Sequence, residues 1–275
     1  MKSVTPVSAE DFRTRIDKND RILVLGSCFA ANMGDRLAKA GFDLCVNPFG
    51  TLFNPASIAS SIGRLESATP FGLQDCVPLG AGAGLWGSFH HYTKFARPSP
   101  EEFLDNANAA LRVASEFFRS CTAVIVTFGT AFVFEHIPCG NPDTGEGMSG
   151  IVANCLKRPA REFRRYMLSH EDIVQMWRPL MQGALKGKKL IFTVSPVRHM
   201  ADGAHGNGLS KATLLLAEDS LVREFPDASY FPSYEIVLDE LRDYRWFAED
   251  LVHPSPEAID LVWERFRIIT GSSPR

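Results

Sequence analysis

The pattern of hydrophobic and polar positions predicts a chain in which buried strands alternate with amphipathic helices. Three short apolar runs, rich in β-branched residues, each stop at glycine or proline, which is typical of strands buried on both faces. These runs are residues 22–26, 123–129 and 189–196, and two weaker candidates are residues 42–46 and 229–235. Strands that alternate with helices predict an α/β fold with a mainly parallel sheet covered on both faces.

Helical periodicity lies between these strands. The predicted helices are residues 30–40, 169–186 and 209–224, and two more begin at the capping sequences Ser99-Pro100 and Ser255-Pro256. Residues 66–98 and 138–160 fit neither period, and we interpret them as insertions. No repeat or linker divides the chain, so residues 1–275 are predicted to form a single elaborated domain.

Small polar residues follow the three strong strands. Ser27-Cys28, Gly129-Thr130 and Ser195-Pro196 come directly after them. Because ligands of parallel sheets bind outside the carboxyl ends of the strands, these residues are expected at the edge that forms the site.

Cys28 and Ser27 are both candidate nucleophiles, placed where the first strand turns into a helix. The N-terminus of a helix favours an anion, which would lower a thiol pKa and stabilise an oxyanion. Cys28 suits this position, since a thiolate needs less activation than a hydroxyl. Ser27 is the alternative nucleophile and would need a base within hydrogen-bonding reach. In the non-catalytic interpretation, Ser27 caps the helix and Cys28 packs beneath it.

A histidine preceded by an aspartate supplies a candidate base. Asp250 and His253 stand three positions apart before the last predicted helix, a spacing that can bring the carboxylate to Nδ1 and leave Nε2 free. A second such pair, Asp202 and His205, lies in a glycine-rich stretch that we interpret as a mobile loop. That loop follows the strand at 189–196 and could edge the same pocket.

Charge and cysteine usage exclude several classes of protein. The formal net charge of −3 gives no basic field for nucleic acid or an anionic membrane. No apolar run approaches the roughly 20 residues that span a bilayer, and the N-terminus lacks the apolar stretch of a signal peptide. The six cysteines form no C-x-x-C pair. We expect reduced thiols in a cytoplasmic protein, all except Cys28 being mostly buried.

Other polar residues are candidates for substrate contacts. His90 and His91 either line the pocket or bind a metal, but no acid or cysteine at metal-like spacing accompanies them, so we expect neither a metal nor another cofactor. Arg198 and Lys211 hold an acidic substrate or are solvated surface charges.

Several segments of the chain resemble the GSCFA-domain family. The stretch "LGSCFA" at 25–30 matches the signature that names this family. Further blocks that look like it are "NPFGTLFNPASI" (47–58), "TFGTAFVFE" (127–135), "TVSPVRH" (193–199), "LSKATLL" (209–215) and "YFPSYEIVLDELRDYRWFAEDLVHPS" (230–255). That family is in turn similar to the SGNH, or GDSL-like, hydrolases, so the resemblance implies a three-layer α/β/α sandwich.

The resemblance also implies roles for individual residues. Cys28 takes the place of the nucleophile, Asp250 and His253 that of the acid and base, and Gly50 that of an oxyanion donor. The third block departs from the hydrolases, because Gly129-Thr130 stands where they carry an asparagine. Thr130 or Asn54 could replace that donor. Asn47, Asn54 and Ser195 lie in matching blocks and either shape the pocket or hold turns.

The sequence therefore predicts an acyl-transfer enzyme, either an ester hydrolase or an O-acyltransferase that acts on a small molecule or a saccharide. A cysteine nucleophile forms a thioester, which can pass its acyl group to an acceptor or to water. The alternative is a non-catalytic binding or accessory protein that retains the fold. The acyl group, the acceptor and the oligomeric state stay open.

Overall fold

The centre of the protein is a five-stranded parallel sheet with the strand order β10-β9-β5-β1-β2. The computed structural model describes residues 5–80, 82–137 and 150–272. The strands of this sheet are β1 (Arg21–Gly26), β2 (Asp43–Val46), β5 (Ala123–Phe128), β9 (Lys189–Val194) and β10 (Ala228–Tyr230). All five predicted strands are confirmed, although the last is shorter than expected, because Ser233–Glu235 starts a short helix, α6.

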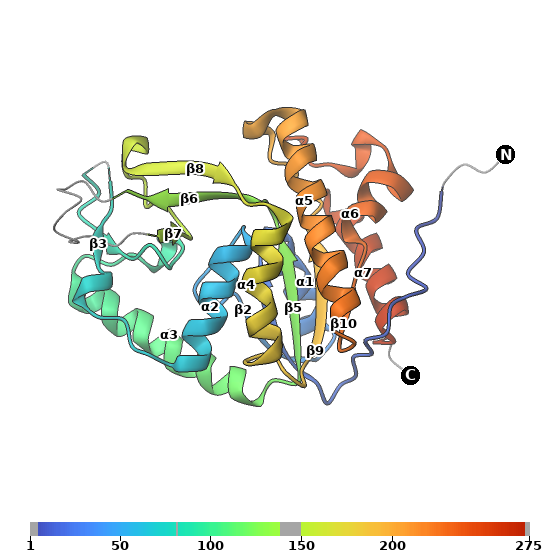
Figure 1. Cartoon of the computed structure of the whole chain (residues 1–275), viewed down its shortest axis with the longest axis horizontal. Coiled ribbons are helices and arrows are strands. Elements are labelled where there is room, and N and C mark those ends of the chain that lie inside the picture. The colour runs from blue at the N-terminus through green and yellow to red at the C-terminus, as the bar shows by residue number, and fades with distance from the viewer. Residues whose placement is uncertain (1–4, 81, 138–149, 273–275) are drawn as a thin grey trace.

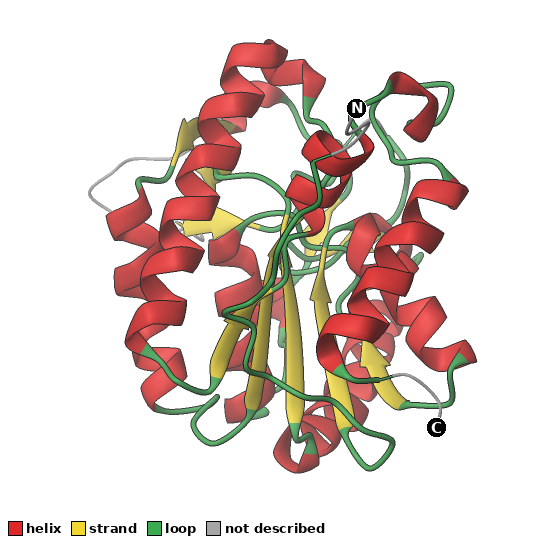
Figure 2. Ribbon diagram, turned by 90° about the vertical axis from the view of Figure 1, so that its right-hand side faces the viewer, coloured by secondary structure: helices red, strands yellow, loops and turns green. Residues whose placement is uncertain are grey.

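Helices cover both faces of the central sheet (Figures 1 and 2). They are α1 (Cys28–Lys39), α2 (Pro55–Ser67), α3 (Pro100–Ser120), α4 (His170–Gln182), α5 (Gly203–Glu224) and α7 (Pro256–Thr270). Alternate residues of a strand point to opposite faces, and in β1 Leu23 packs into the larger core while Val24 packs into the smaller one. The larger core contains the buried faces of α2, α3, α4 and α5, and the smaller one those of α1 and α7. The fold is therefore a three-layer α/β/α sandwich.

Two parts of the fold were not predicted. Helix α2 was not recognised, and a small antiparallel sheet of β7 (Gly150–Val152), β6 (Phe132–His136) and β8 (Phe163–Met167) lies above the carboxyl end of the central sheet (Figure 1). A hairpin of β3 (Val77–Pro78) and β4 (Trp86–Gly87) lies in the first predicted insertion. Within the second, residues 138–149 are outside the described residues.

The glycine-rich stretch around His205 is not a loop. It forms the first turns of α5, which begins at Gly203 directly after a 3-10 turn at Met200–Asp202. The other short helical turns are Leu73–Asp75, Thr93–Phe95, Ala160–Glu162, Tyr244–Trp246 and a π-helical turn at Ile236–Leu241. Within the described ranges, no helix combines the length and apolar character needed to cross a bilayer.

The strand order places a crevice at the carboxyl ends of β1 and β5. After β1 the chain moves outward to β2, and it then crosses back to build β5, β9 and β10 on the other side of β1. Connections that leave in opposite directions open a crevice between neighbouring strands, where α/β proteins bind ligands. Ser27-Cys28 and Gly129-Thr130 lie at this point.

Candidate active site

A cleft of about 720 Å³ opens at the carboxyl ends of β1, β5 and β9. Both predicted catalytic partners, Cys28 and His253, line it. The other lining residues are Ser27, Phe53, Asn54, Thr130, Phe132, Phe134, Val152, Ala153, Asn154, Cys155, Arg165, Val197, Arg198, His199, Ala201, Asp202 and Val252. Residues that follow β1, residues of the loop before α7 and residues of the antiparallel sheet therefore line one cavity.

Gly26 makes the turn that presents the cysteine. Its φ of +141° is a conformation that residues with a Cβ rarely adopt, and a Cβ there would lie 2.3 Å from the carbonyl oxygen of Thr127. The N–H of Gly26 donates to Asn47 Oδ1 at 2.8 Å. Asn47 therefore holds this turn and does not line the cleft, so its predicted contact with substrate is not supported.

Cys28 is the first residue of α1 and is partly buried at the cleft wall. Burial raises the pKa of its thiol above the ordinary value, and this effect exceeds the opposing pull of the N–H groups of Phe29 and Cys28 and of the Lys211 charge. The N–H groups at the helix N-terminus do lower this pKa, as predicted, but burial outweighs them and the net shift is upward. With its pKa raised, the thiol is mainly protonated at neutral pH.

Ser27 occupies the N-cap position of α1, but its side chain makes no capping hydrogen bond. The residue is 1% exposed, and its Oγ has no hydrogen-bond partner among the described residues. Ser27 also lines the cleft, so the structure leaves both adjacent residues beside the cavity.

The Asp250–His253 pair is formed by a tight turn. Leu251 has a left-handed φ of +54°, and Asp250 Oδ1 accepts the N–H groups of Val252 at 2.9 Å and of His253 at 3.0 Å. Asp250 Oδ2 then lies 2.7 Å from Nδ1 of His253. The hydrogen bonds from the backbone and ring of His253 lower the pKa of the Asp250 carboxyl to about 2. This contact orients the ring and leaves Nε2 available.

The two glycines predicted near the oxyanion already use their N–H groups. Gly50 donates to the carbonyl of Asn47 at 2.8 Å and does not line the cleft. Gly129 donates to the carbonyl of Phe53, also at 2.8 Å. Neither N–H is free for a substrate oxygen, so the donor role predicted for Gly50 is not supported.

Asn54 and Thr130, the two residues suggested to replace the missing donor, both line the cleft. Asn54 caps α2, because its Oδ1 accepts the N–H of Ser57 at 2.8 Å. This bond fixes the amide and leaves Nδ2 as the group without a partner among the described residues. The Thr130 hydroxyl is engaged with Ser210 Oγ at 3.1 Å and with the N–H of Phe132. Asn54 is therefore the better candidate.

Lys211 and Ser195 are structural. Lys211 was expected to hold an acidic substrate or to be a surface charge, yet it is 1% exposed and does not line the cleft. Its Nζ donates to the carbonyls of Gly129 at 2.6 Å and of Ser195 at 2.7 Å, which joins the ends of β5 and β9. Burial lowers the pKa of the Lys211 ammonium group to about 7. Ser195 is fully buried, does not line the cleft, and its Oγ accepts the N–H of Val197.

Replacing Lys211 with methionine should destabilise the protein, because two buried carbonyls lose their donor. We expect a loss of about 2–4 kcal/mol, which corresponds to a melting temperature lower by about 5–10 °C. Circular dichroism at increasing temperature measures this. The matched control is Lys186→Met, since Lys186 is exposed. Equal melting temperatures for the two variants would mean that the hydrogen bonds from Lys211 to the ends of β5 and β9 do not stabilise the protein.

Asp202 and His205 form no hydrogen bond or ion pair with each other in the described part of the chain. Asp202 lines the cleft, as its position after the strand suggested, and forms an ion pair with Arg165 of β8. His205 does not line the cleft. Arg198 does line it, and its contact with a substrate stays a prediction.

His199 was missed as a site residue although it lies in one of the quoted blocks. It lines the cleft, and its Nε2 is buried without a hydrogen-bond partner among the described residues. Burial, helped by the charge of Lys211, lowers the pKa of this imidazole to about 4, so it is neutral near pH 7. Its place five residues after the end of β9 is the signal that could have identified it.

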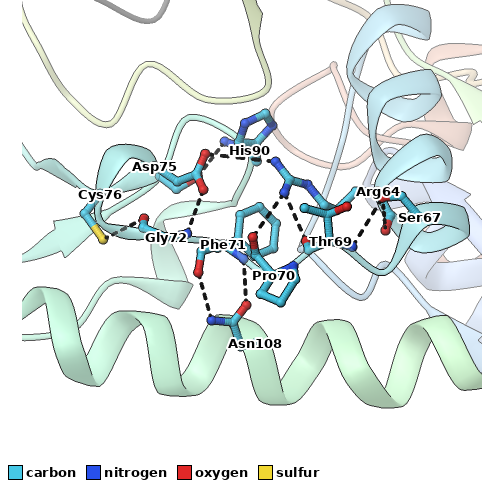
Figure 3. A network of polar contacts seen from close by, with 11 residues as sticks. Arg64, Ser67, Thr69, Pro70, Phe71, Gly72, Asp75, Cys76, His90 and Asn108 are labelled. Atoms are coloured by element: carbon cyan, nitrogen blue, oxygen red, sulfur yellow. Dashed lines mark hydrogen bonds and ion pairs between the residues drawn. The ribbon is translucent and has the colours of Figure 1, made fainter.

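His90 and His91 lie away from the cleft. His91 is fully buried among aromatic rings, including those of Phe71 and Phe103, and burial lowers its pKa to about 3. Figure 3 shows His90 beside the ion pair of Arg64 and Asp75. The prediction that these histidines line the pocket was therefore wrong. Over the residues described, no group of three histidine, cysteine or acidic side chains is arranged to hold a metal ion.

The cysteines other than Cys28 are less buried than predicted. Of those described, Cys121 is buried, while Cys45, Cys76 and Cys155 are intermediate, and all are free thiols. Cys155 lines the cleft. Cys139 lies outside the described residues.

The protein is an α/β protein of the three-layer sandwich class, with a cysteine at the carboxyl end of its first strand. Comparison with family models identifies the family. The model of the GSCFA family matches residues 21–266, and the chain belongs to that family. The match spans every strand of the central sheet and the cleft residues from Ser27 to His253. No curated protein matched the chain.

Proposed function

We propose that the protein transfers acyl groups from esters, with Cys28 as nucleophile, His253 as general base and Asp250 as the group that orients the imidazole. The acceptor is water or the hydroxyl of a small molecule or saccharide. One observation carries this proposal. The 2.7 Å contact of Asp250 with Nδ1 directs the His253 ring so that Nε2 is free, on a cleft that Cys28 also lines.

The proposed first step uses general-base catalysis. Nε2 of His253 takes the thiol proton while Sγ of Cys28 forms a bond to the substrate carbonyl carbon. The imidazolium then gives this proton to the departing alkoxide, and a thioester remains on Cys28. The acceptor hydroxyl attacks the thioester by the same route in reverse. A neutral resting thiol, as its raised pKa implies, fits this sequence because the proton leaves only during attack.

The developing oxyanion needs hydrogen-bond donors. We assign this role to the N–H of Cys28, in the first turn of α1, and to Nδ2 of Asn54. The SGNH and GDSL-like hydrolases that the chain resembles combine a first-strand nucleophile with a C-terminal Asp-x-x-His pair. The same order from Cys28 to His253 supports the proposal.

A non-catalytic binding protein is the second candidate. The observation that favours it concerns Gly50 and Gly129, the two glycines in the blocks that resemble the family. Their N–H groups donate to backbone carbonyls and are not free for an oxyanion. Such a protein would bind its ligand in the same cleft without covalent chemistry.

Turnover and alkylation together test the proposal. The protein should release nitrophenolate from a short-chain nitrophenyl ester, and iodoacetamide should stop this release by modifying Cys28. Because the thiol pKa is raised, the alkylation rate should increase about tenfold per pH unit from pH 6 to 8.

The control for this measurement is Cys45, a thiol outside the cleft. Burial raises the pKa of Cys45 to about 11. It should be labelled more slowly than Cys28 at every pH. Labelling of Cys28 that is already maximal at pH 6 would contradict the neutral resting thiol, and absence of any ester turnover would favour the binding protein.

A further inference from the structure

The charges that line the cleft do not cancel. Among its described lining residues, the side chains with a full charge are Arg165, Arg198 and Asp202. Asp202 is almost buried and is paired with Arg165. Arg198 has no carboxylate within 4.0 Å in the described part of the chain. Arg198, which also lines a neighbouring pocket with Tyr244 and Phe247, is therefore the lining cation of the cleft that no carboxylate contacts.

Arg198 is also held in place. Its N–H donates to the carbonyl of Val252 at 3.0 Å, and its Nη1 donates to that of Leu251 at 3.2 Å. The rings of Tyr244 and Phe247 lie 5.7 Å from Cζ. A guanidinium group has five N–H donors, so one bond to Leu251 leaves most of them free, and an ordered side chain loses little entropy on binding a ligand. Leu251 and Val252, whose carbonyls accept these two hydrogen bonds, belong to the turn that carries His253.

The wider surroundings of the cleft add to the positive potential. Lys211 is buried and does not line the cleft, and in its protonated form its charge favours the thiolate of Cys28. The N-terminus of α1 opens into the same cleft and favours an anion. Both effects act in the same direction as the unpaired guanidinium, whereas the carboxylate of Asp250 acts in the opposite direction.

Another part of the cleft lining is aromatic. Phe132 and Phe134 of β6 line it, and the Arg165 guanidinium packs on both rings, 4.1 Å and 5.5 Å from their centroids. Phe134 is 39% exposed. A substrate in this cleft would therefore meet a cationic group on the side of His253 and an apolar surface on the side of β6.

We propose that the acyl donor or acceptor carries an anionic group, a carboxylate or a phosphate, which Arg198 binds while an apolar part of the molecule packs against Phe132 and Phe134. This inference rests on the proposed function and adds the substrate class to it. Arginine matches both oxyanions with parallel N–H donors, so the shared chemistry is a planar or tetrahedral oxyanion.

The test compares two nitrophenyl esters of equal acyl length, one with a neutral acyl chain and one that ends in a carboxylate. In the wild type, kcat/KM should be higher for the anionic ester. In Arg198→Gln, the ratio of the two values should fall about 10–100-fold, because a charge-assisted hydrogen bond is lost. Arg198→Lys should recover part of the ratio. Arg112→Gln removes an exposed arginine of α3 and is the matched control.

The ratio of the two kcat/KM values shows whether Arg198 binds the substrate or only supports the structure. If Arg198 only supported the His253 turn, both esters would lose rate equally and the ratio would not change, which would overturn the inference while the proposed function stands. Inorganic phosphate and monocarboxylates, tested as competitive inhibitors at constant ionic strength, distinguish the two oxyanions.

A binding measurement covers the case in which no ester is turned over. Phosphate or succinate should raise the melting temperature of the Cys28→Ala protein and should not raise that of Cys28→Ala/Arg198→Gln. Equal shifts in both proteins would contradict an anion site at Arg198, whatever the fate of the acyl-transfer proposal.

Discussion

Replacing Cys28 with alanine should abolish turnover of a nitrophenyl ester and leave the fold intact. Without the sulfur no thioester forms, and only the oxyanion donors and the cleft remain to accelerate hydrolysis. We expect kcat to fall by about 10⁴-fold or more, the scale seen when a covalent nucleophile is removed. No hydrogen bond from Sγ holds another part of the described chain together, so the melting temperature should change little. Steady-state kinetics and thermal unfolding measure both.

Ser27→Ala and Cys45→Ala are the matched controls for this variant. Ser27 Oγ has no hydrogen-bond partner among the described residues, and Cys45 lies outside the cleft, so both variants should retain most of the activity. If Cys28→Ala were active and Ser27→Ala inactive, the serine would be the nucleophile and the proposed mechanism would be wrong by one position.

Changing Asp250 to asparagine should lower kcat by about 10³–10⁴-fold at neutral pH. The asparagine Oδ1 can still accept the N–H groups of Val252 and His253, so the turn is retained. Its Nδ2, however, would donate to Nδ1 and place the ring proton on Nε2, which then cannot accept the thiol proton. His253→Ala should lose at least as much, because the base itself is absent.

The matched control for the carboxylate is Asp105→Asn, since Asp105 is exposed on α3. The pH profile adds a second check. Because the pKa of Asp250 is lowered to about 2, the carboxylate stays ionised above pH 3, and the acid limb of kcat should not report Asp250. Full activity of Asp250→Asn would mean that the carboxylate does not orient the base.

The central sheet could be predicted because its strands are covered on both faces and therefore consist of continuous apolar runs. Helix α2 could not be found from hydrophobic periodicity, since half of its buried positions are alanine or serine. Its capping sequence Asn54-Pro55 was a usable signal. The sheet of β6, β7 and β8 depends on pairing between distant segments, which a local pattern does not encode.

The sequence could predict Cys28 and His253 as candidates from their residue types and their positions in the chain. Both line the cleft. Predictions failed where the outcome depends on burial. Lys211 is spaced like a surface residue of α5 but points at two strand ends, and the thiol of Cys28 is desolvated more than the helix terminus compensates. The N–H of Gly50 is likewise used by a turn that the sequence alone does not reveal.

Mass spectrometry of the acid-quenched protein tests the central claim most directly. During turnover of an activated ester, a fraction of the chain should gain the mass of the acyl group, and peptide mapping should place it on Cys28 as a thioester that neutral hydroxylamine removes. An acyl group that resists neutral hydroxylamine and maps to Ser27, or ester turnover with no acyl group on Cys28 at any quench time, would contradict the account.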